Sequence, residues 1–143
     1  MGEANHVLEL VARRNAAVAR GDAAAMVAPV SEDIVHYSLA PPLAQSGAEA
    51  RDPEAAAAWL ATWDAPPRIA LPHPTVLLDG DLAVIFGLAA MGGTGADGEE
   101  GAMWYRTTIV LRRRDGEWTI VHEHESVPFL MDGSDKAALD LEP

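Results

Sequence analysis

The segment WTIVHEHESVPF, residues 118–129, concentrates side chains that can transfer protons. His122, Glu123, His124, Glu125 and Ser126 occupy five consecutive positions at the end of an apolar run. Imidazole titrates near neutral pH, and a pocket can shift its pKa in either direction, so a histidine can serve as general base or general acid. The segment is therefore a candidate catalytic site, a candidate metal site, or the polar edge of an ordinary strand.

The alternation of side chains along a β-strand decides which of these groups can act together. Glu123 and Glu125 should share one face, where we expect them to be solvated or to lie at a subunit interface. The opposite face is expected to carry Trp118, Ile120, His122, His124 and Ser126. On this basis the two histidines, and not the two glutamates, are the candidates for acid–base catalysis.

The preceding strand supplies a cation, Arg106, whose neighbours depend on the turn at 115–116. A three-residue loop with a glycine bulge would set Arg106 opposite His124, whereas a two-residue loop would shift the register by one and place it beside Glu125. We favour the three-residue loop because it gathers basic and aromatic side chains on one surface. These side chains are Trp104, Arg106, Trp118, His122 and His124.

Three helices in the first half of the chain should position these strands. They are expected at 5–20, 22–28 and 52–63, with Asn5, Asp22 and Asp52 as N-caps. Gly21 can end the first helix, and Pro53 suits the first position of the third. Apolar residues of the first helix recur at helical spacing, which predicts one buried face.

Strands are expected at 33–43 and, after Pro67, in runs at 68–80, 81–93, 101–116 and 117–129. Asp-Gly pairs at 79–80 and 115–116 separate such runs and favour hairpins. The glycine-rich stretch 92–101 has no lysine and no following helix, so it reads as a hairpin tip rather than a phosphate-binding loop. This order predicts an α+β fold whose helices pack on one face of a curved antiparallel sheet, with a cavity between them.

The composition bounds the function. The 143 residues predict a single domain, 1–143, and the formal net charge of −12 opposes binding to nucleic acid or to an anionic membrane surface. The absence of cysteine excludes disulfides, thiol catalysis and cysteine-ligated metals. No apolar run approaches the roughly 20 residues of a membrane span, and no signal peptide is apparent at the start, so a cytoplasmic location is expected.

The run MWYRTTIVLRRRDGEWTIVHEHESVPF, preceded by SLAPPL and by a tryptophan-bearing helix, resembles the SnoaL-like, ketosteroid-isomerase-like branch of the nuclear transport factor 2-like superfamily. Its most specific part is the pattern W-x-R-T … DG-x-W-x-I-V-H-x-H-x-S. The resemblance implies a cone-shaped α+β barrel around a deep pocket, and a homodimer formed through the convex sheet face. It implies a pocket lined by His36, Trp59, Trp63, Trp104, Arg106, His122 and His124.

Several residues of this pocket have alternative interpretations. Only one of His36 and Tyr37 can face the cavity, and the resemblance favours His36 as a catalytic group. Tyr37 and Ser126 remain candidate substrate contacts, together with Trp59, Trp63 and Trp104. The four tryptophans could instead form the core. Family enzymes use a pocket carboxylate as the base, but Ser38 stands where some relatives carry an aspartate, so a histidine would have to replace it.

The enzyme hypothesis is a cofactor-free isomerase, cyclase or dehydratase acting on a small hydrophobic carbonyl compound. His122 or His124 would take a proton, and Arg106 with a tyrosine would hold the developing oxyanion. Alternatively, these side chains form a structural polar network, or the His-x-His pair binds a metal with His36 as third ligand. No third donor follows from the spacing and the resemblance implies a metal-free site, so no metal or cofactor is expected.

Two non-catalytic functions are also compatible with the sequence. One is a module that binds a small molecule in the same pocket without transforming it. The other is assembly, because the association domain of calcium/calmodulin-dependent kinase carries a similar turn of the type RRDG-x-W-x-IVH-x-H. That domain is usually joined to another, whereas this chain reads as free-standing, so assembly ranks last.

Overall fold

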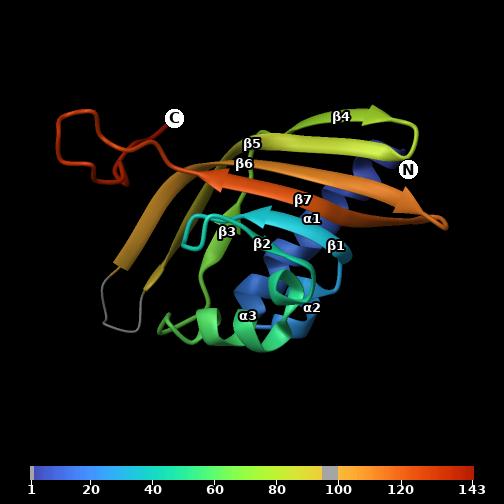
Figure 1. Ribbon diagram of the computed structural model, residues 1–143, viewed down its shortest axis with the longest axis horizontal. Coiled ribbons are helices and arrows are strands. Elements are labelled where there is room, and N and C mark those ends of the chain that lie inside the picture. Colours follow the sequence, from blue (N-terminus) through green and yellow to red (C-terminus); the bar gives the residue numbers. More distant parts are fainter. Residues whose placement is uncertain (1, 95–99) are drawn as a thin grey trace.

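The computed structural model describes residues 2–94 and 100–143, and the tip of the glycine-rich hairpin, 95–99, lies outside them. Helices dominate the first half of the chain and strands the second (Figure 1). The helices are α1 (Glu3–Arg20), α2 (Ala23–Val27), the 3-10 helix η1 (Gly47–Arg51) and α3 (Pro53–Leu60). The strands are β1 (Val30–Tyr37), β2 (Gln45–Ser46), β3 (Arg68–Ala70), β4 (Thr75–Asp79), β5 (Leu82–Thr94), β6 (Glu100–Arg114) and β7 (Glu117–Ser126).

The strands form one curved sheet in the order β2-β1-β7-β6-β5-β3, with β4 pairing a different part of β5. The α+β prediction is confirmed, and α1, α2 and α3 gather on one side of the sheet (Figure 1). The sheet does not close into a barrel. It is also not purely antiparallel, because β1 and β7 pair in parallel. This pairing brings the first strand of the chain beside the last.

Local signals account for most helix boundaries. The Asp22 side chain accepts a hydrogen bond from Ala25 N at 3.1 Å, and the Asp52 side chain accepts one from Glu54 N at 2.9 Å, so both predicted caps are confirmed. Gly21 ends α1 in the left-handed conformation, with φ 70°. Asn5 is not the N-cap of α1, because the helix begins at Glu3 and the backbone N–H of Asn5 donates to the carbonyl oxygen of Gly2.

The core lies between α1 and the concave face of the sheet. Its side chains come from α1, β1, β5, β6 and β7, and the most deeply buried include Val7, Ile34, Ile85, Leu111 and Ile120. Burying each such side chain contributes about 1.5–3 kcal/mol. This layer holds α1 against the sheet and defines one end of the space in which the polar residues of the site are found.

The β6–β7 hairpin departs from the predicted register. Asp115 and Gly116 form a two-residue turn with φ of 52° and 79°, so the three-residue loop is wrong. Both positive φ values suit the tight turn that matches strand twist, which Asp-Gly favours. Further along, Leu111 pairs with Ile120 but Val110 pairs with His122, which leaves Val121 as an extra, bulged residue.

The bulge reverses the alternation of side chains in β7. Ile120 is buried on the concave side, and so is Glu123, although they are three positions apart and regular alternation would place them on opposite faces. Beyond Val121, the odd-numbered residues therefore face the helices and the even-numbered ones face away.

No helix in the described part of the chain is long and apolar enough to cross a bilayer.

Candidate functional site

A cavity of about 420 Å³ lies between the concave face of the sheet and the helices. Most of its lining is aliphatic, from α1, α2, β3 and the segment before β2. A polar group interrupts this lining where β1, β6 and β7 run side by side. It consists of Arg14, His36, Tyr105, Thr107, Glu123 and Glu125. An apolar hollow with a few convergent polar groups is the usual form of a small-molecule site.

Glu123 is paired with Arg14 of α1. Both guanidinium NH groups donate to the two carboxylate oxygens, and the Nη1–Oε2 distance is 2.8 Å. Glu123 is only 7% exposed. Burial alone would raise its pKa, but the charge and hydrogen bonds of Arg14 outweigh burial and hold the pKa below its usual value. The pair is therefore ionised, and each charge compensates the other.

Glu125 is paired with His36 of β1. The His36 Nε2 and Glu125 Oε1 atoms are 2.6 Å apart, and both side chains are 20% exposed. Burial would lower the pKa of His36, but the hydrogen bond to Glu125 and the charges of Glu123 and Glu125 raise it on balance. This environment favours the imidazolium form over the neutral ring and places a proton against a carboxylate.

Tyr105 and Thr107 are consecutive inward residues of β6. Tyr105 is 5% exposed, and burial together with the charges of Glu125 and Glu123 raises its pKa above the usual range. The phenol is therefore a neutral hydrogen-bond donor. Within residues 2–93 and 103–143, no side-chain hydrogen bond joins its hydroxyl to another residue, and the side chain borders the cavity. Thr107 lies opposite Glu125 in the β6–β7 ladder and lines the same space.

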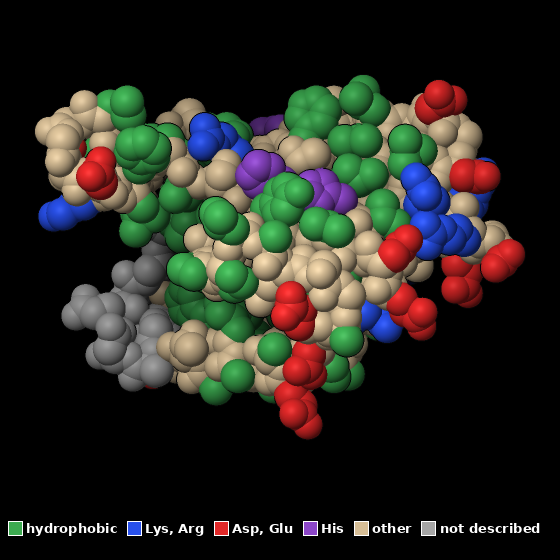
Figure 2. All heavy atoms as spheres, in the orientation of Figure 1, with side chains coloured by type: hydrophobic (Ala, Val, Ile, Leu, Met, Phe, Trp, Pro, Cys, Tyr) green, Lys and Arg blue, Asp and Glu red, His purple; other side chains and the backbone are tan. Residues whose placement is uncertain are grey.

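His122 and His124 lie on the opposite, outer face of the sheet. Their rings pack edge-on against Tyr37, with centroid separations of 4.9 Å and 5.4 Å. Nδ1 of His122 is 2.7 Å from the Val35 carbonyl oxygen. Histidine and hydrophobic side chains lie together on this surface (Figure 2). The predicted catalytic histidines therefore do not line the cavity.

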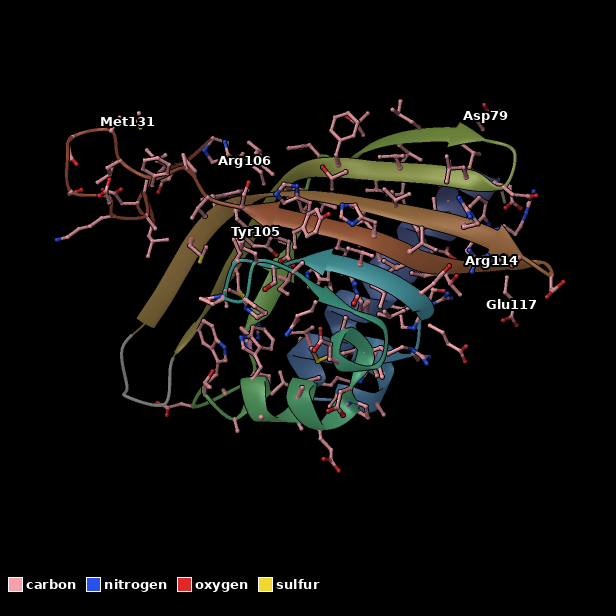
Figure 3. All side chains as sticks on the ribbon, viewed as in Figure 1. Asp79, Tyr105, Arg106, Arg114, Glu117 and Met131 are labelled. Atoms are coloured by element: carbon pink, nitrogen blue, oxygen red, sulfur yellow. The ribbon has the colours of Figure 1, made fainter. Side chains whose placement is uncertain are left out.

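Arg106 lies on the outer face as well. Its Nε donates to the Ser126 hydroxyl at 3.1 Å, because the bulge pairs Arg106 with Ser126 and not with His124 or Glu125. Tyr105 and Arg106 lie on opposite sides of the sheet (Figure 3). Trp104 alternates with Tyr105 and so also points outward. The face of the sheet turned away from the cavity thus carries six of the predicted site residues: Tyr37, Trp104, Arg106, His122, His124 and Ser126.

The expectation that Glu123 and Glu125 are solvated or at an interface is wrong. Strict alternation from Trp118 and Ile120 would place them outside, but the bulge at Val121 turns them inward. A signal for this was present in α1, where Arg14 falls on the same stripe as Val7, Val11 and Val18. An arginine on a buried stripe requires a buried carboxylate partner.

The remaining candidates divide between the cavity and its surroundings. His36, Ser38 and Trp59 line the cavity. Trp63 packs edge-on against Trp59 at a centroid distance of 6.3 Å. Trp118 belongs to the far end of the core, where its Nε1 donates to Glu3 at 2.6 Å.

A shared metal site at His36, His122 and His124 is not formed. His36 faces the cavity, whereas the other two histidines lie beyond the sheet. Among the side chains of residues 2–93 and 103–143, no group of three or more histidine, aspartate or glutamate residues has the spacing to hold a metal ion.

Comparison with known proteins agrees with this architecture. The SnoaL-like domain family matches residues 7–130. The chain belongs to this family. A search among curated proteins gave no match for this SnoaL-like domain. An NTF2-like protein of unknown function from Pseudomonas putida KT2440 is 30% identical, with a TM-score of 0.85 over 98% of this chain and 96% of that one.

Two further solved structures are described as an association domain and as a hub. A putative calcium/calmodulin-dependent protein kinase II association domain from Xanthomonas campestris is 28% identical, with a TM-score of 0.75 over 88% of each chain. The CaMKII hub from S. rosetta is 24% identical, with a TM-score of 0.66 over 88% of this chain and 97% of that one. The second likeness concerns the fold alone.

Proposed function

We propose that this SnoaL-like domain is a cofactor-free acid–base enzyme of the isomerase, cyclase or dehydratase type. Its substrate is a small, largely apolar carbonyl compound held in the cavity. The observation that carries the proposal is the 2.6 Å contact between His36 Nε2 and Glu125 Oε1 on the sheet side of a mostly aliphatic hollow. A carboxylate and an imidazolium in contact can remove and return a proton within one site.

The chemistry needs a base, an acid and a donor for the oxygen that gains charge. Glu125 removes a proton from the carbon beside the carbonyl, and the electron pair moves onto oxygen as an enolate. The Tyr105 hydroxyl, kept protonated by its raised pKa, donates a hydrogen bond to this oxygen. His36, whose pKa is raised, returns a proton to the substrate at the same carbon or a neighbouring one. Atoms and charge balance without another reactant.

The Arg14–Glu123 pair has a positioning role. It joins α1 to β7 two residues before Glu125, so it fixes the strand that carries the base. Because its charges compensate each other, the pair adds little net field at the Glu125–His36 contact. The expected consequence is that Arg14 affects where Glu125 sits and does not itself contact substrate.

The test is deuterium incorporation. The protein is incubated in heavy water with a panel of cyclic ketones, and exchange of the protons beside the carbonyl is followed by NMR. Exchange should fall about 100-fold or more in Glu125→Gln, the usual size of a general-base contribution. Glu117→Gln is the matched control, because it removes the same charge from the exposed end of the same strand. Equal exchange in wild type and Glu125→Gln would refute the proposal.

A second candidate function, self-association, is favoured by the outer face of the sheet. Large apolar side chains stay partly exposed there: Val35 (37%), Tyr37 (40%), Phe86 (39%) and Leu88 (46%). They lie on β1 and β5, which are joined in one row across the sheet, since Phe86 pairs with Thr108, Thr108 with His124, and His124 with Tyr37. We propose that a second copy of the chain covers this surface in a homodimer, as exposed apolar patches commonly mark interfaces.

Sedimentation equilibrium tests the dimer. Phe86→Glu should shift the protein from dimer to monomer, because it places a charge from each copy within the apolar interface. Leu43→Glu is the control, as Leu43 is 97% exposed outside the sheet. A wild-type protein that is monomeric at high concentration would exclude this candidate without affecting the catalytic proposal.

A further inference from the structure

The cavity has a wall formed by η1 and α3 that the proposed acid–base pair does not use. Glu49, Asp52 and Trp59 line the cavity from this wall. Asp52 caps α3 and Trp59 lies seven residues further on, so both lie on one side of the helix two turns apart. A carboxylate and an indole on the same wall of a cavity can both attract a cation.

The charges that line the cavity are unbalanced. Four carboxylates, from Glu49, Asp52, Glu123 and Glu125, are matched by one guanidinium and one imidazole, those of Arg14 and His36. Arg14 and His36 are already bound to Glu123 and Glu125. Glu49 and Asp52 therefore face the space with no cationic partner among the described lining residues. Their side chains accept only backbone N–H groups, of Ser46 and Glu54.

An anionic ligand has no cation available in this cavity. Arg14 could bind one only by leaving Glu123, which would then be a buried carboxylate without a partner. The nearby Arg51 is not part of the lining, and its Nε donates to the Val30 carbonyl oxygen at 3.2 Å. The net charge of −12 adds a field over the whole molecule that repels anions and attracts cations.

The opposite wall shows that the cavity is built to meet a polar ligand. The Tyr105 side chain is only 5% exposed and lines the cavity. No side-chain hydrogen bond joins its hydroxyl to another described residue, and no enclosed polar side-chain atom among these residues lacks a partner, so the hydroxyl opens onto the cavity. The Tyr105 hydroxyl can therefore donate a hydrogen bond to a ligand atom, on the side of the cavity opposite the η1–α3 wall. A ligand that satisfies both walls carries an acceptor oxygen at one end and a positive charge at the other.

We infer that the ligand is a cationic amphiphile: an organic ammonium compound with an apolar body, whose charged group lies against Glu49, Asp52 and Trp59. Combined with the proposed function, on which this last step rests, the substrate is an amine-bearing carbonyl compound. Its ammonium group binds at the η1–α3 wall and its carbonyl oxygen at Tyr105. The aliphatic lining between the walls holds the body of the molecule.

The two carboxylates can be neutralised without disturbing the local structure. Asparagine caps helices as well as aspartate does, so Asp52→Asn keeps the α3 cap. Glutamine replaces glutamate in a capping box, so Glu49→Gln keeps the bond to Ser46 N. Glu54→Gln is the matched control, because Glu54 lies in the first turn of α3 but outside the cavity lining.

The experiment is calorimetric titration at neutral pH with three probes that share one ring system: 2-naphthylethylammonium, 2-naphthylethanol and naphthylacetate. The ammonium probe should bind about tenfold more tightly than the alcohol, and the carboxylate most weakly, as expected for a partly exposed charge pair with an aromatic contact. In the double variant E49Q/D52N the ammonium preference should disappear while the affinity for the alcohol is kept. Glu54→Gln should retain the preference.

Three outcomes would overturn the inference: naphthylacetate binding as tightly as the ammonium probe, no binding of the ammonium probe, or an ammonium preference that survives in E49Q/D52N. Thermal melting of the double variant verifies that the fold is kept. The deuterium-exchange test uses neutral ketones and depends on Glu125. Charge selectivity without exchange would therefore refute the acid–base proposal alone, and exchange without charge selectivity would refute this inference alone.

Discussion

The two faces of the sheet at β6–β7 carry similar ionisable residues in different environments. On the inner face, Glu123 and Glu125 are enclosed, and each is bound to a basic side chain from a distant element. On the outer face, His122 and His124 pack around Tyr37 beside exposed apolar groups. Neighbours in one short sequence thus belong to a pocket and to a surface. Proton-transfer capacity follows from enclosure and partner rather than from the residue type alone.

The largest expected difference between the faces comes from breaking the inner ion pair. Arg14→Met leaves Glu123 buried without a counter-charge, and the free energy of unfolding should fall by about 3–5 kcal/mol. Urea denaturation followed by circular dichroism measures this. The double variant R14M/E123L should recover a substantial part of the loss. A loss of less than about 1 kcal/mol in Arg14→Met would show that Glu123 reaches water.

Deleting Val121 tests whether the bulge itself is needed for the inner face of β7 to form the cavity. Removing the bulged residue restores regular pairing while Ile120 and Glu123 keep their inward direction, so the fold and the cavity should persist at a cost of about 1–3 kcal/mol. Urea denaturation measures the stability of the deletion variant, and binding of 2-naphthylethanol reports whether its cavity is kept. Loss of binding in a folded deletion variant would mean that the bulge itself shapes the cavity.

The inner histidine should give stability a pH dependence. Because its pKa is raised in the folded protein, His36 contributes fully below the ordinary histidine pKa of about 6.5, and the contribution fades as pH rises through the folded pKa. The destabilisation caused by His36→Gln should thus be greater near pH 6 than near pH 9. His124→Gln is the control, since no ion pair joins His124 to any described residue. A pH-independent difference for His36→Gln would contradict the ion pair.

The smallest effects are expected on the outer face. His122→Ala and His124→Ala remove only edge-on ring contacts and a bond near the surface, so each should change the unfolding free energy of the isolated chain by about 1 kcal/mol or less. Neither should alter binding of a probe in the cavity. A loss of probe binding in a folded His124→Ala variant would show that this histidine contributes to the binding site.

Local chemistry explains what could be predicted from the sequence. The caps at Asp22 and Asp52, the stop at Gly21 and both Asp-Gly hairpins depend on residues close in the chain, and all of them are present. The order of the expected helices and strands predicted the α+β architecture, and the structure confirms it. His36 and Trp59 were placed in the cavity on the family resemblance, and they line it.

The rest depended on contacts between distant segments. The side of β7 that faces inward is set by one bulged residue, and nothing within VHEHES distinguishes a bulge from regular alternation. The bulge adjoins a second irregularity in the parallel β1–β7 pairing, so it reflects how three strands fit together. Arg14 on the apolar stripe of α1 was the one residue whose burial pointed to a carboxylate on the facing strand.

The parallel pairing of β1 with β7 also governs when the site can form during folding. His36 and Glu125 are 89 positions apart in the chain, and Arg14 and Glu123 are 109 apart. The β5–β6–β7 hairpins need only local contacts, whereas both ion pairs require closure of nearly the whole chain. The candidate site is thus expected to form late in folding. During synthesis the pocket cannot be completed until β7 has emerged from the ribosome.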